Sequence, residues 1–424
     1  MRKMRDSGVE WIGQMPEEWE LERLQWHLEE VVIKNNPIQT TQVLSLTNKK
    51  GVIPYEEKGN QGNVAKESYD GYKIAYPDTI VANSMNILIG SVGYSNYYGC
   101  VSPVYYVFRE KPNNDLKFIN YIMQIPQFQK ELRRYANGIL EIRLRISAGD
   151  ILRRLCAFPN YEEQKRISAY LDNKCGRIDE VIALQEKIIS RLNEYKTSLV
   201  TEAVTRGIKQ DSCMVESNIK WIKRIPKHWK TFRVANLYEQ TSEDGLEELP
   251  ILTVSINSGI SDRELADDEK DRVFVRSEDR TKYKRVRPGD LAYNMMRAWQ
   301  GAFGAVRVDG MVSPAYVTCR PKSGVEIDTR YIEYLFRTPI AIEEMHRYSH
   351  GIADFRLRLY WPEFKNIRLC LPPIEEQMEI ADYIDEKTAK IEATIKMRED
   401  TIAKLQEYKK SLIYEVVTGK KEVL

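Results

Sequence analysis

An internal repeat is the feature that most constrains the fold, because a chain with two copies of one unit must build the same structure twice. The pattern Trp-Ile-x-x-x-Pro-x-x-Trp at residues 11–19 recurs at 221–229. Val-Ser-Pro at 101–103 recurs at 312–314, and the offset between the copies drifts only from 210 to 213. We interpret the tryptophans as packing anchors, since large aromatic side chains contribute strongly to domain cores.

The longest matching block has the periodicity of a long helix. From about 162 to 206, and again from about 375 to 418, charged and aliphatic residues alternate without a proline. Aliphatic residues recur there with steps of 4, 7, 3 and 7, which fits a heptad seam. The seam residues are Ile178, Ile182, Ile189, Leu192 and Leu199, and then Ile391, Ile395, Ile402, Leu405 and Leu412. We expect two long helices packed antiparallel, the alternative being two helices that each lie on their own domain.

The regions before these helices have the pattern of mixed structure. Runs of β-branched and aromatic residues such as 79–81 and 104–108 are bounded by Gly, Pro and Asn, as strands are. Helical stretches such as 118–135 and 331–348 lie among them. The predicted fold is α+β: two mixed α/β domains in a pseudo-twofold repeat, joined by two long antiparallel coiled-coil helices. The predicted boundaries are 1–158 and 211–371 for the domains and 159–210 and 372–424 for the helical regions.

Composition excludes several classes of protein. The chain has 424 residues, 30% charged and 42% hydrophobic, which is typical of a soluble globular protein. No window approaches the roughly 18 uninterrupted apolar residues of a spanning helix. The charged N-terminus lacks the apolar core of a secretion signal, so we expect the chain in the cytoplasm, without a membrane partner. Six scattered cysteines form no C-x-x-C pair, which argues against a zinc ribbon and a disulfide framework.

The sequence also lacks the motifs of common catalytic sites. It contains no phosphate-binding loop, dinucleotide-binding glycine pattern, zinc-protease motif or deaminase motif, and no Asn/Asp-Pro-Pro-Tyr/Phe motif of amino-methyltransferases. His346 and His350 could share a helical face, but a metal site needs a third ligand and nothing nearby supplies one. We therefore predict no catalytic residue, no metal site and no cofactor in this chain.

Local clusters of basic residues favour nucleic-acid binding, although Lys and Arg (64) nearly balance Asp and Glu (62). Amide and aromatic side chains lie among them and could supply base-edge and stacking contacts. We expect residues 83–98 and 294–304 to form major-groove loops, and the arginines of two Arg-Leu-Arg motifs to contact phosphates, with helix-capping salt bridges as the alternative. The candidate DNA-binding residues are Asn83, Asn86, Tyr94, Arg143, Arg145, Lys282, Lys284, Tyr293, Asn294, Arg297, Gln300, Arg356 and Arg358.

With these motifs the chain resembles the specificity subunits of type I restriction-modification systems over essentially its whole length. The resemblance rests on Gly-Val-Glu-Trp-Ile-Gly at 8–13, Pro-Gly-Asp-Leu at 288–291, Gly351 with Arg356 and Leu357, and Leu-Pro-Pro-Ile-Glu-Glu-Gln at 371–377. It implies a non-catalytic subunit in which two target-recognition domains each read one half of an interrupted double-stranded DNA site. It also implies that the long helices set the gap between the halves and dock two methyltransferase subunits, which hold S-adenosylmethionine, and that restriction subunits using ATP and Mg²⁺ join them.

Two departures from the family pattern bear on local rigidity. The first copy reads Phe-Pro-Asn-Tyr-Glu-Glu-Gln at 158–164, without the second proline, and Cys175-Gly176 interrupts the first helix.

Two other functions stay open on sequence alone. A self-contained nuclease or methyltransferase with a divergent site would turn over DNA with Mg²⁺ and S-adenosylmethionine and no added subunit. A coiled-coil adaptor whose globular halves bind proteins would not bind DNA even with the methyltransferase present.

Overall fold

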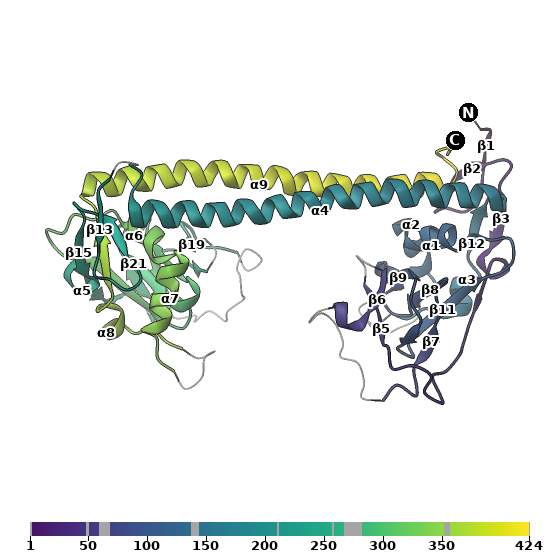
Figure 1. The fold of residues 1–424 in the computed structure, drawn as a ribbon, viewed down its shortest axis with the longest axis horizontal. Helices are drawn as coiled ribbons and strands as arrows, with labels where there is room; N and C mark the ends of the chain where they lie inside the picture. The colour runs from purple at the N-terminus through teal and green to yellow at the C-terminus, as the bar shows by residue number, and fades with distance from the viewer. Residues whose placement is uncertain are drawn as a thin grey trace. The chain divides into compact units, whose positions relative to one another are not determined.

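The chain divides into two units, each built around its own hydrophobic core. Unit 1 comprises Met1–Gln185 with Glu399–Leu424, and unit 2 comprises Glu186–Arg398. The computed structural model describes residues 2–47, 51–58, 68–136, 144–209, 212–256, 258–266, 282–351 and 357–423. Figure 1 labels many of the elements of each unit.

Unit 1 is organised around a four-stranded antiparallel sheet. Its strand order is β4 (Leu28–Glu30), β11 (Tyr105–Glu110), β8 (Thr79–Asn83) and β9 (Val92–Ser95). Helix α1 (Leu116–Gln124) packs on β8 and β9, and α2 (Pro126–Arg133) follows it. The remaining elements are β1 (Met4–Asp6) paired with β2 (Gln14–Pro16), β3 (Glu20–Arg23) with β12 (Leu155–Phe158), β5 (Leu44–Thr47) with β6 (Gly51–Pro54), β7 (Lys73–Ala75) with β10 (Gly99–Val101), the 3-10 helices η1 (Leu24–Trp26), η2 (Tyr55–Lys58) and η3 (Ile87–Ile89), and α3 (Ala148–Leu152).

Unit 2 repeats this sheet. The strand order is β16 (Tyr238–Thr241), β24 (Tyr316–Pro321), β21 (Leu291–Asn294) and β22 (Phe303–Ala305), with α6 (Thr329–Phe336) and α7 (Pro339–Arg347) in the places of α1 and α2. The register also recurs, since Asn83 pairs with Tyr105 and Asn294 with Tyr316. The remaining elements are β13 (Met214–Glu216) with β14 (Arg224–Pro226), β15 (Lys230–Arg233) with β25 (Arg368–Leu371), β17 (Glu243–Asp244), β20 (Lys284–Val286) and β23 (Gly310–Val312) in one sheet, β18 (Val254–Ser255) with β19 (Gly259–Ile260), η7 (Ala298–Gln300), α5 (Val234–Leu237) and α8 (Trp361–Phe364).

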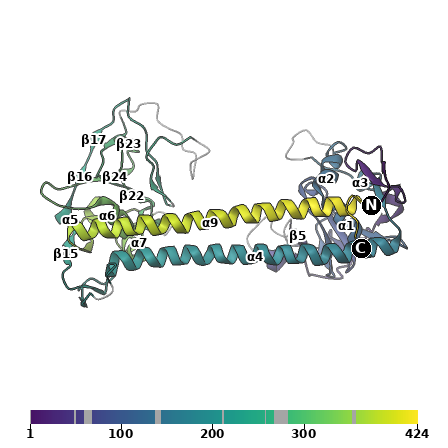
Figure 2. The same ribbon diagram turned by 90° about the horizontal axis from the view of Figure 1, so that it is seen from above.

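Two long helices, α4 (Tyr161–Arg206) and α9 (Ile374–Val417), contribute a segment to each unit and lie side by side there (Figures 1 and 2). In unit 1 Lys409 Nζ lies 2.7 Å from Asp179 Oδ1. In unit 2 Lys196 Nζ lies 3.2 Å from Glu392, and Lys209, just past α4, pairs with the earlier Glu379, so the helices run antiparallel. All ten predicted seam residues are buried or half-buried. The predicted fold class and antiparallel coiled coil are confirmed, and α4 continues through Gly176.

Each core is completed by the end of a long helix. In unit 1, Leu412 and Val416 of α9 pack in the same cluster as Trp11 and Trp19. In unit 2, Val204 of α4 packs in the cluster that contains Trp229. The Trp-x-x-x-x-Pro motif therefore anchors a long helix to the start of a domain, as expected of large buried aromatic side chains.

The Glu-Glu-Gln motif fixes the start of each long helix through its glutamine. Gln377 donates from Nε2 to the carbonyl of Pro372 (2.9 Å) and accepts from the backbone N–H of Asp328 (3.0 Å). Gln164 makes the same two contacts with Pro159 and Asp115, both at 3.0 Å. In the first copy Asn160 stands where the second has proline, and its side chain accepts from Glu163 N (3.0 Å), which caps the helix. The missing proline is thus replaced by a helix cap.

Candidate nucleic-acid interface

Each unit presents the same partly exposed loop at one end of its central sheet. In unit 1 the loop is residues 84–91, between β8 and β9, and in unit 2 it is residues 295–302, between β21 and β22. Each contains one turn of 3-10 helix, η3 or η7, that ends at a glycine in the left-handed region: Gly90 at φ 96° and Gly301 at φ 95°. Glycine adopts this conformation without a steric penalty, which explains the matching positions in the two copies.

A buried asparagine starts each loop. The side chain of Asn83 accepts from the N–H of Met85, and that of Asn294 from the N–H of Met296, both at 3.0 Å. Such side-chain turns stabilise an abrupt change of chain direction after a strand. Both asparagines were predicted to contact DNA, but they are 6% exposed and committed to these contacts. We therefore do not include them in the proposed interface.

The structure brings each loop next to its Arg-Leu-Arg segment, which lies more than 50 residues further along the chain. The N–H of Ile146 donates to the carbonyl of Ser84 (3.1 Å), and that of Leu359 to the carbonyl of Met295 (2.8 Å). The neighbouring Arg145 and Arg358 are both exposed. Loop and arginine, assigned to DNA separately from the sequence, thus form one surface in each unit.

Aromatic side chains flank this surface in unit 2. In unit 2 the ring of Trp299 makes an edge contact with that of His346, with centroids 5.6 Å apart, and Arg358 lies 3.4 Å from the hydroxyl of Tyr360. Exposed arginine beside aromatic and amide groups is typical of nucleic-acid-binding surfaces.

The other predicted residues occupy different environments. Asn86 and Gln300 are exposed in the loops, and Arg297 is half-buried beside η7. Tyr293 is fully buried against Phe303 and Phe364, so its position is that of a core residue. Tyr94 is half-buried and bonded to Asp78, and burial with this contact raises its pKa. Arg143 and Arg356 lie outside the described residues.

The two predicted lysines lie at strand β20, away from the loop between β21 and β22. Lys282 is exposed just before β20, and Lys284 within it donates to the carbonyl of Tyr316 (2.7 Å). Burial lowers the pKa of Lys284. In unit 1, Lys73 makes the same contact with the carbonyl of Tyr105 (2.8 Å). Lys73 was not among the predicted residues, although it lies 211 positions before Lys284, at the offset of the repeat. Both lysines stabilise the strand that carries the tyrosine.

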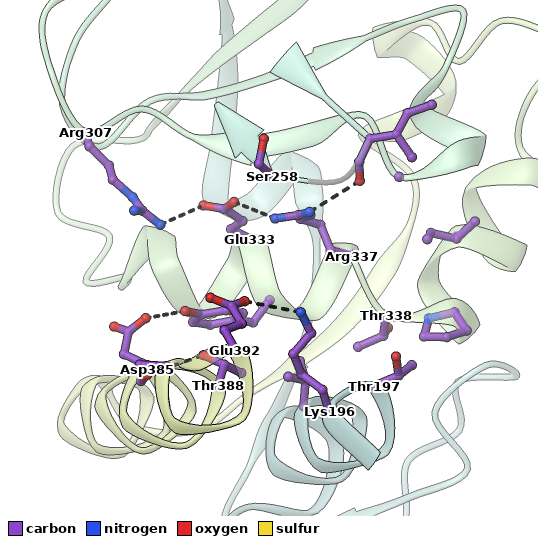
Figure 3. Close-up of a pocket in the computed structure, with 17 residues that line it drawn as sticks. Lys196, Thr197, Ser258, Arg307, Glu333, Arg337, Thr338, Asp385, Thr388 and Glu392 are labelled. Carbon is purple, nitrogen blue, oxygen red and sulfur yellow. Dashed lines mark hydrogen bonds and ion pairs between the residues drawn. The ribbon is translucent and has the colours of Figure 1, made fainter. Parts of the chain in front are cut away.

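A cavity of about 580 Å³ in unit 2 lies between α6 and the long helices (Figure 3). Glu333 sits between Arg337 (3.2 Å) and Arg307 (3.7 Å), and burial raises the pKa of its carboxyl. Lys196 pairs with Glu392, and the hydroxyl of Tyr334 donates to Asp385. Each charged side chain of the lining has a partner within the lining, so we interpret this cavity as a structural junction.

The described residues contain no group of three or more His, Cys, Asp or Glu side chains placed to hold a metal ion. Five of the six cysteines are buried, and burial raises the pKa of the Cys175 and Cys370 thiols to about 11, which makes them poor nucleophiles. None of the helices in the described ranges is both long and apolar enough to span a bilayer.

Comparisons with known proteins agree with this architecture. No protein-family model matches the chain. A curated relative, the type I restriction enzyme EcoBI specificity subunit of Escherichia coli, is 22% identical over 280 residues, which is 62% of this chain and 58% of the relative. A chain from a structure on complex assembly and conformational transition of the type I R-M system has a TM-score of 0.70 at 14% identity and covers 96% of this chain and 99% of its own. The HsdS subunit of Thermoanaerobacter tengcongensis has a TM-score of 0.52 at 14% identity, with 96% and 98% covered. The resemblance to specificity subunits and their fold is thereby confirmed.

Proposed function

We propose that this chain is the DNA-recognition subunit of a type I restriction-modification complex and carries no catalytic site. Segments 1–158 and 211–371 would each read one half of an interrupted double-stranded DNA site, and segments 159–210 and 372–424 would set the gap. The observation that carries the proposal is the recurrence of one partly exposed loop beside one exposed arginine in both units. Two such modules on one chain suit a two-part DNA site.

Methylation and cleavage would be supplied by other subunits of the complex. In this proposal two methyltransferase subunits bring S-adenosylmethionine, and two restriction subunits bring ATP and Mg²⁺. This chain would bind DNA and position those subunits on it, so that its own residues act by binding alone.

The long helices carry a surface suited to docking the methyltransferase subunits. In unit 1, the hydroxyl of Tyr121 donates to Asp172 (2.8 Å), so this side of α4 faces the domain. Val181 lies nine residues after Asp172, a net rotation of about 180°, and so points away from the domain. Leu184 lies next to Val181, one turn further along α4. In α9, Tyr408 has the same heptad position as Val181 has in α4. We call Val181, Leu184 and Tyr408 the outer patch of unit 1.

Unit 2 has an equivalent outer patch formed by Tyr195 and Met397, which the repeat relates to Tyr408 and Leu184. Leu184 is 58% exposed and Met397 69%. Positions outside the seam of a coiled coil are usually polar, and exposed apolar side chains gathered at one place mark interaction sites. One outer patch in each unit fits two copies of a partner per chain.

Adenine-methylation mapping tests the proposed function. The chain is co-expressed with its neighbouring methyltransferase subunit, and genomic DNA is compared with that of cells that lack this chain. We expect a new two-part methylated sequence with a fixed gap. Absence of new methylation from an assembled complex would contradict the proposal and favour an adaptor, whereas methylation or cleavage by the purified chain alone would identify it as an enzyme.

Replacing Arg145 or Arg358 with alanine should weaken binding to all DNA sequences alike. Each arginine is proposed to neutralise one phosphate, so its loss should reduce the slope of log affinity against log salt concentration by about one. The measurement is DNA binding by the assembled complex at several salt concentrations. Arg109→Ala is the matched control, because Arg109 is exposed and ion-paired with Glu29 on another part of unit 1. A change of sequence preference at an unchanged slope would refute the phosphate assignment.

A further inference from the structure

We propose that the apex residue of each loop, Ile89 in unit 1 and Gln300 in unit 2, reads a base pair of its half-site. Ile89 would contact the methyl group of a thymine, and Gln300 would hydrogen-bond to an adenine. The inference rests on the proposed DNA-recognition function and adds which side chains discriminate and between which bases.

The two residues occupy one structural position. Each is the last residue of its 3-10 turn, directly before the left-handed glycine, Gly90 or Gly301. The backbone around them is alike in the two loops, so the units differ here in side-chain chemistry rather than in shape. A position that keeps its geometry while its chemistry changes is suited to setting sequence preference.

The loops are braced from behind, which holds the apex outward. A Cβ atom on Gly90 would lie 3.5 Å from Gln129 Nε2 of α2, and one on Gly301 would lie 3.2 Å from Ile342 Cδ1 of α7. The glycine side of each turn thus lies against a helix of its own unit. Discrimination between bases benefits from such a supported backbone, because a rigid residue loses little freedom on binding.

Ile89 is 67% exposed, more than any other large apolar side chain in the described ranges outside α4 and α9. Its side chain can form no hydrogen bond, and in the major groove the apolar group available to it is the thymine methyl. Arg145, on the segment bonded to this loop, supplies the positive charge that would hold the loop against the DNA backbone.

Gln300 is exposed, and its side-chain amide makes no hydrogen bond within the described part of the chain. A free glutamine amide can pair with adenine N6 and N7 at once, which distinguishes an A·T pair from the other three in the major groove. Arg297 and Arg358 lie on the same surface. Gln300 therefore has both the donor and the acceptor that adenine reading requires, and no described residue competes for them.

The test exchanges the two side chains in the full-length chain co-expressed with the methyltransferase subunit. In the Ile89→Gln variant, the preferred base at one position of the first half-site should change from thymine to adenine, and adenine should be favoured over thymine by about tenfold or more. The second half-site should stay unchanged. Gln300→Ile should do the reverse in the second half-site. Trp26→Gln is the matched control, because Trp26 also ends a 3-10 turn of unit 1 and is 63% exposed, yet lies outside the loop. It should leave the methylated sequence unchanged.

An assembled Ile89→Gln complex that methylates the wild-type sequence would overturn the inference, as would an equal loss of methylation at all sequences. If this variant fails to assemble, Ile89→Ala decides: loss of thymine preference supports the inference and its retention refutes it. Failure of the proposed function itself is distinguishable, since the wild-type complex would then produce no two-part methylated sequence.

Discussion

Replacing Leu184 and Tyr408 with glutamate should reduce the number of methyltransferase subunits bound to each chain from two to one. Both side chains are more than half exposed in the outer patch of unit 1. Docking would bury them, and a buried unpaired carboxylate is strongly unfavourable, so we expect affinity at this patch to fall by about a hundredfold or more. The measurement is the mass of the co-purified complex by native mass spectrometry.

Two controls make this result specific. Ala183→Glu adds one such negative charge at an exposed position of α4 outside the outer patch and should leave two subunits bound. Tyr195→Glu with Met397→Glu should remove the other subunit, and all four changes together should remove both. Two bound subunits in the Leu184 and Tyr408 variant would show that docking uses another surface.

Lengthening both long helices by one heptad should lengthen the gap between the two half-sites. Duplicating residues 179–185 in α4 and 392–398 in α9 preserves the seam, because seven residues are one full repeat. The added helix is about 10 Å long, or about three base pairs at 3.4 Å each. Three base pairs also turn the duplex by about 100°, so we expect slower methylation at the new sites.

Methylation mapping measures this result directly. The two half-sites should stay unchanged while the gap becomes longer. Duplication in α4 alone mismatches the seam and should prevent assembly, which serves as the control. A gap that stays the same in the doubly lengthened chain would show that the helices do not set it.

The elements that could be predicted from the sequence are those with a local periodic signal. The seam from Ile178 to Leu199 follows from spacing alone, because helical periodicity appears in neighbouring residues. The tryptophan anchors follow from the repeat. The helix cap at Asn160 was missed, since the same residue type is equally common in turns.

The candidate site was predicted only in part, because burial depends on contacts between distant segments. Tyrosine is a residue type that often contacts nucleic acid at a surface, but Phe303 and Phe364 enclose the ring of Tyr293. The apposition of Arg358 and its loop depends on a backbone contact between Leu359 and Met295, which no local pattern encodes. The outer patch was also not predicted. Tyr195 and Tyr408 match in the repeat, but a heptad pattern identifies only the residues that pack between the helices, and it carries no information about the function of the outward-facing ones.

The presence of Leu412 and Val416 in the core of unit 1 has a consequence for synthesis of the chain on the ribosome. Unit 2 is one uninterrupted segment, whereas unit 1 needs residues from both ends of the sequence. Domains usually fold in the order in which they are made. Here the second unit can complete its core while the first still waits for the last turns of α9. A nascent chain that stalls near residue 398 therefore leaves the core around Trp11 and Trp19 uncovered, which makes it a substrate for chaperones until translation resumes.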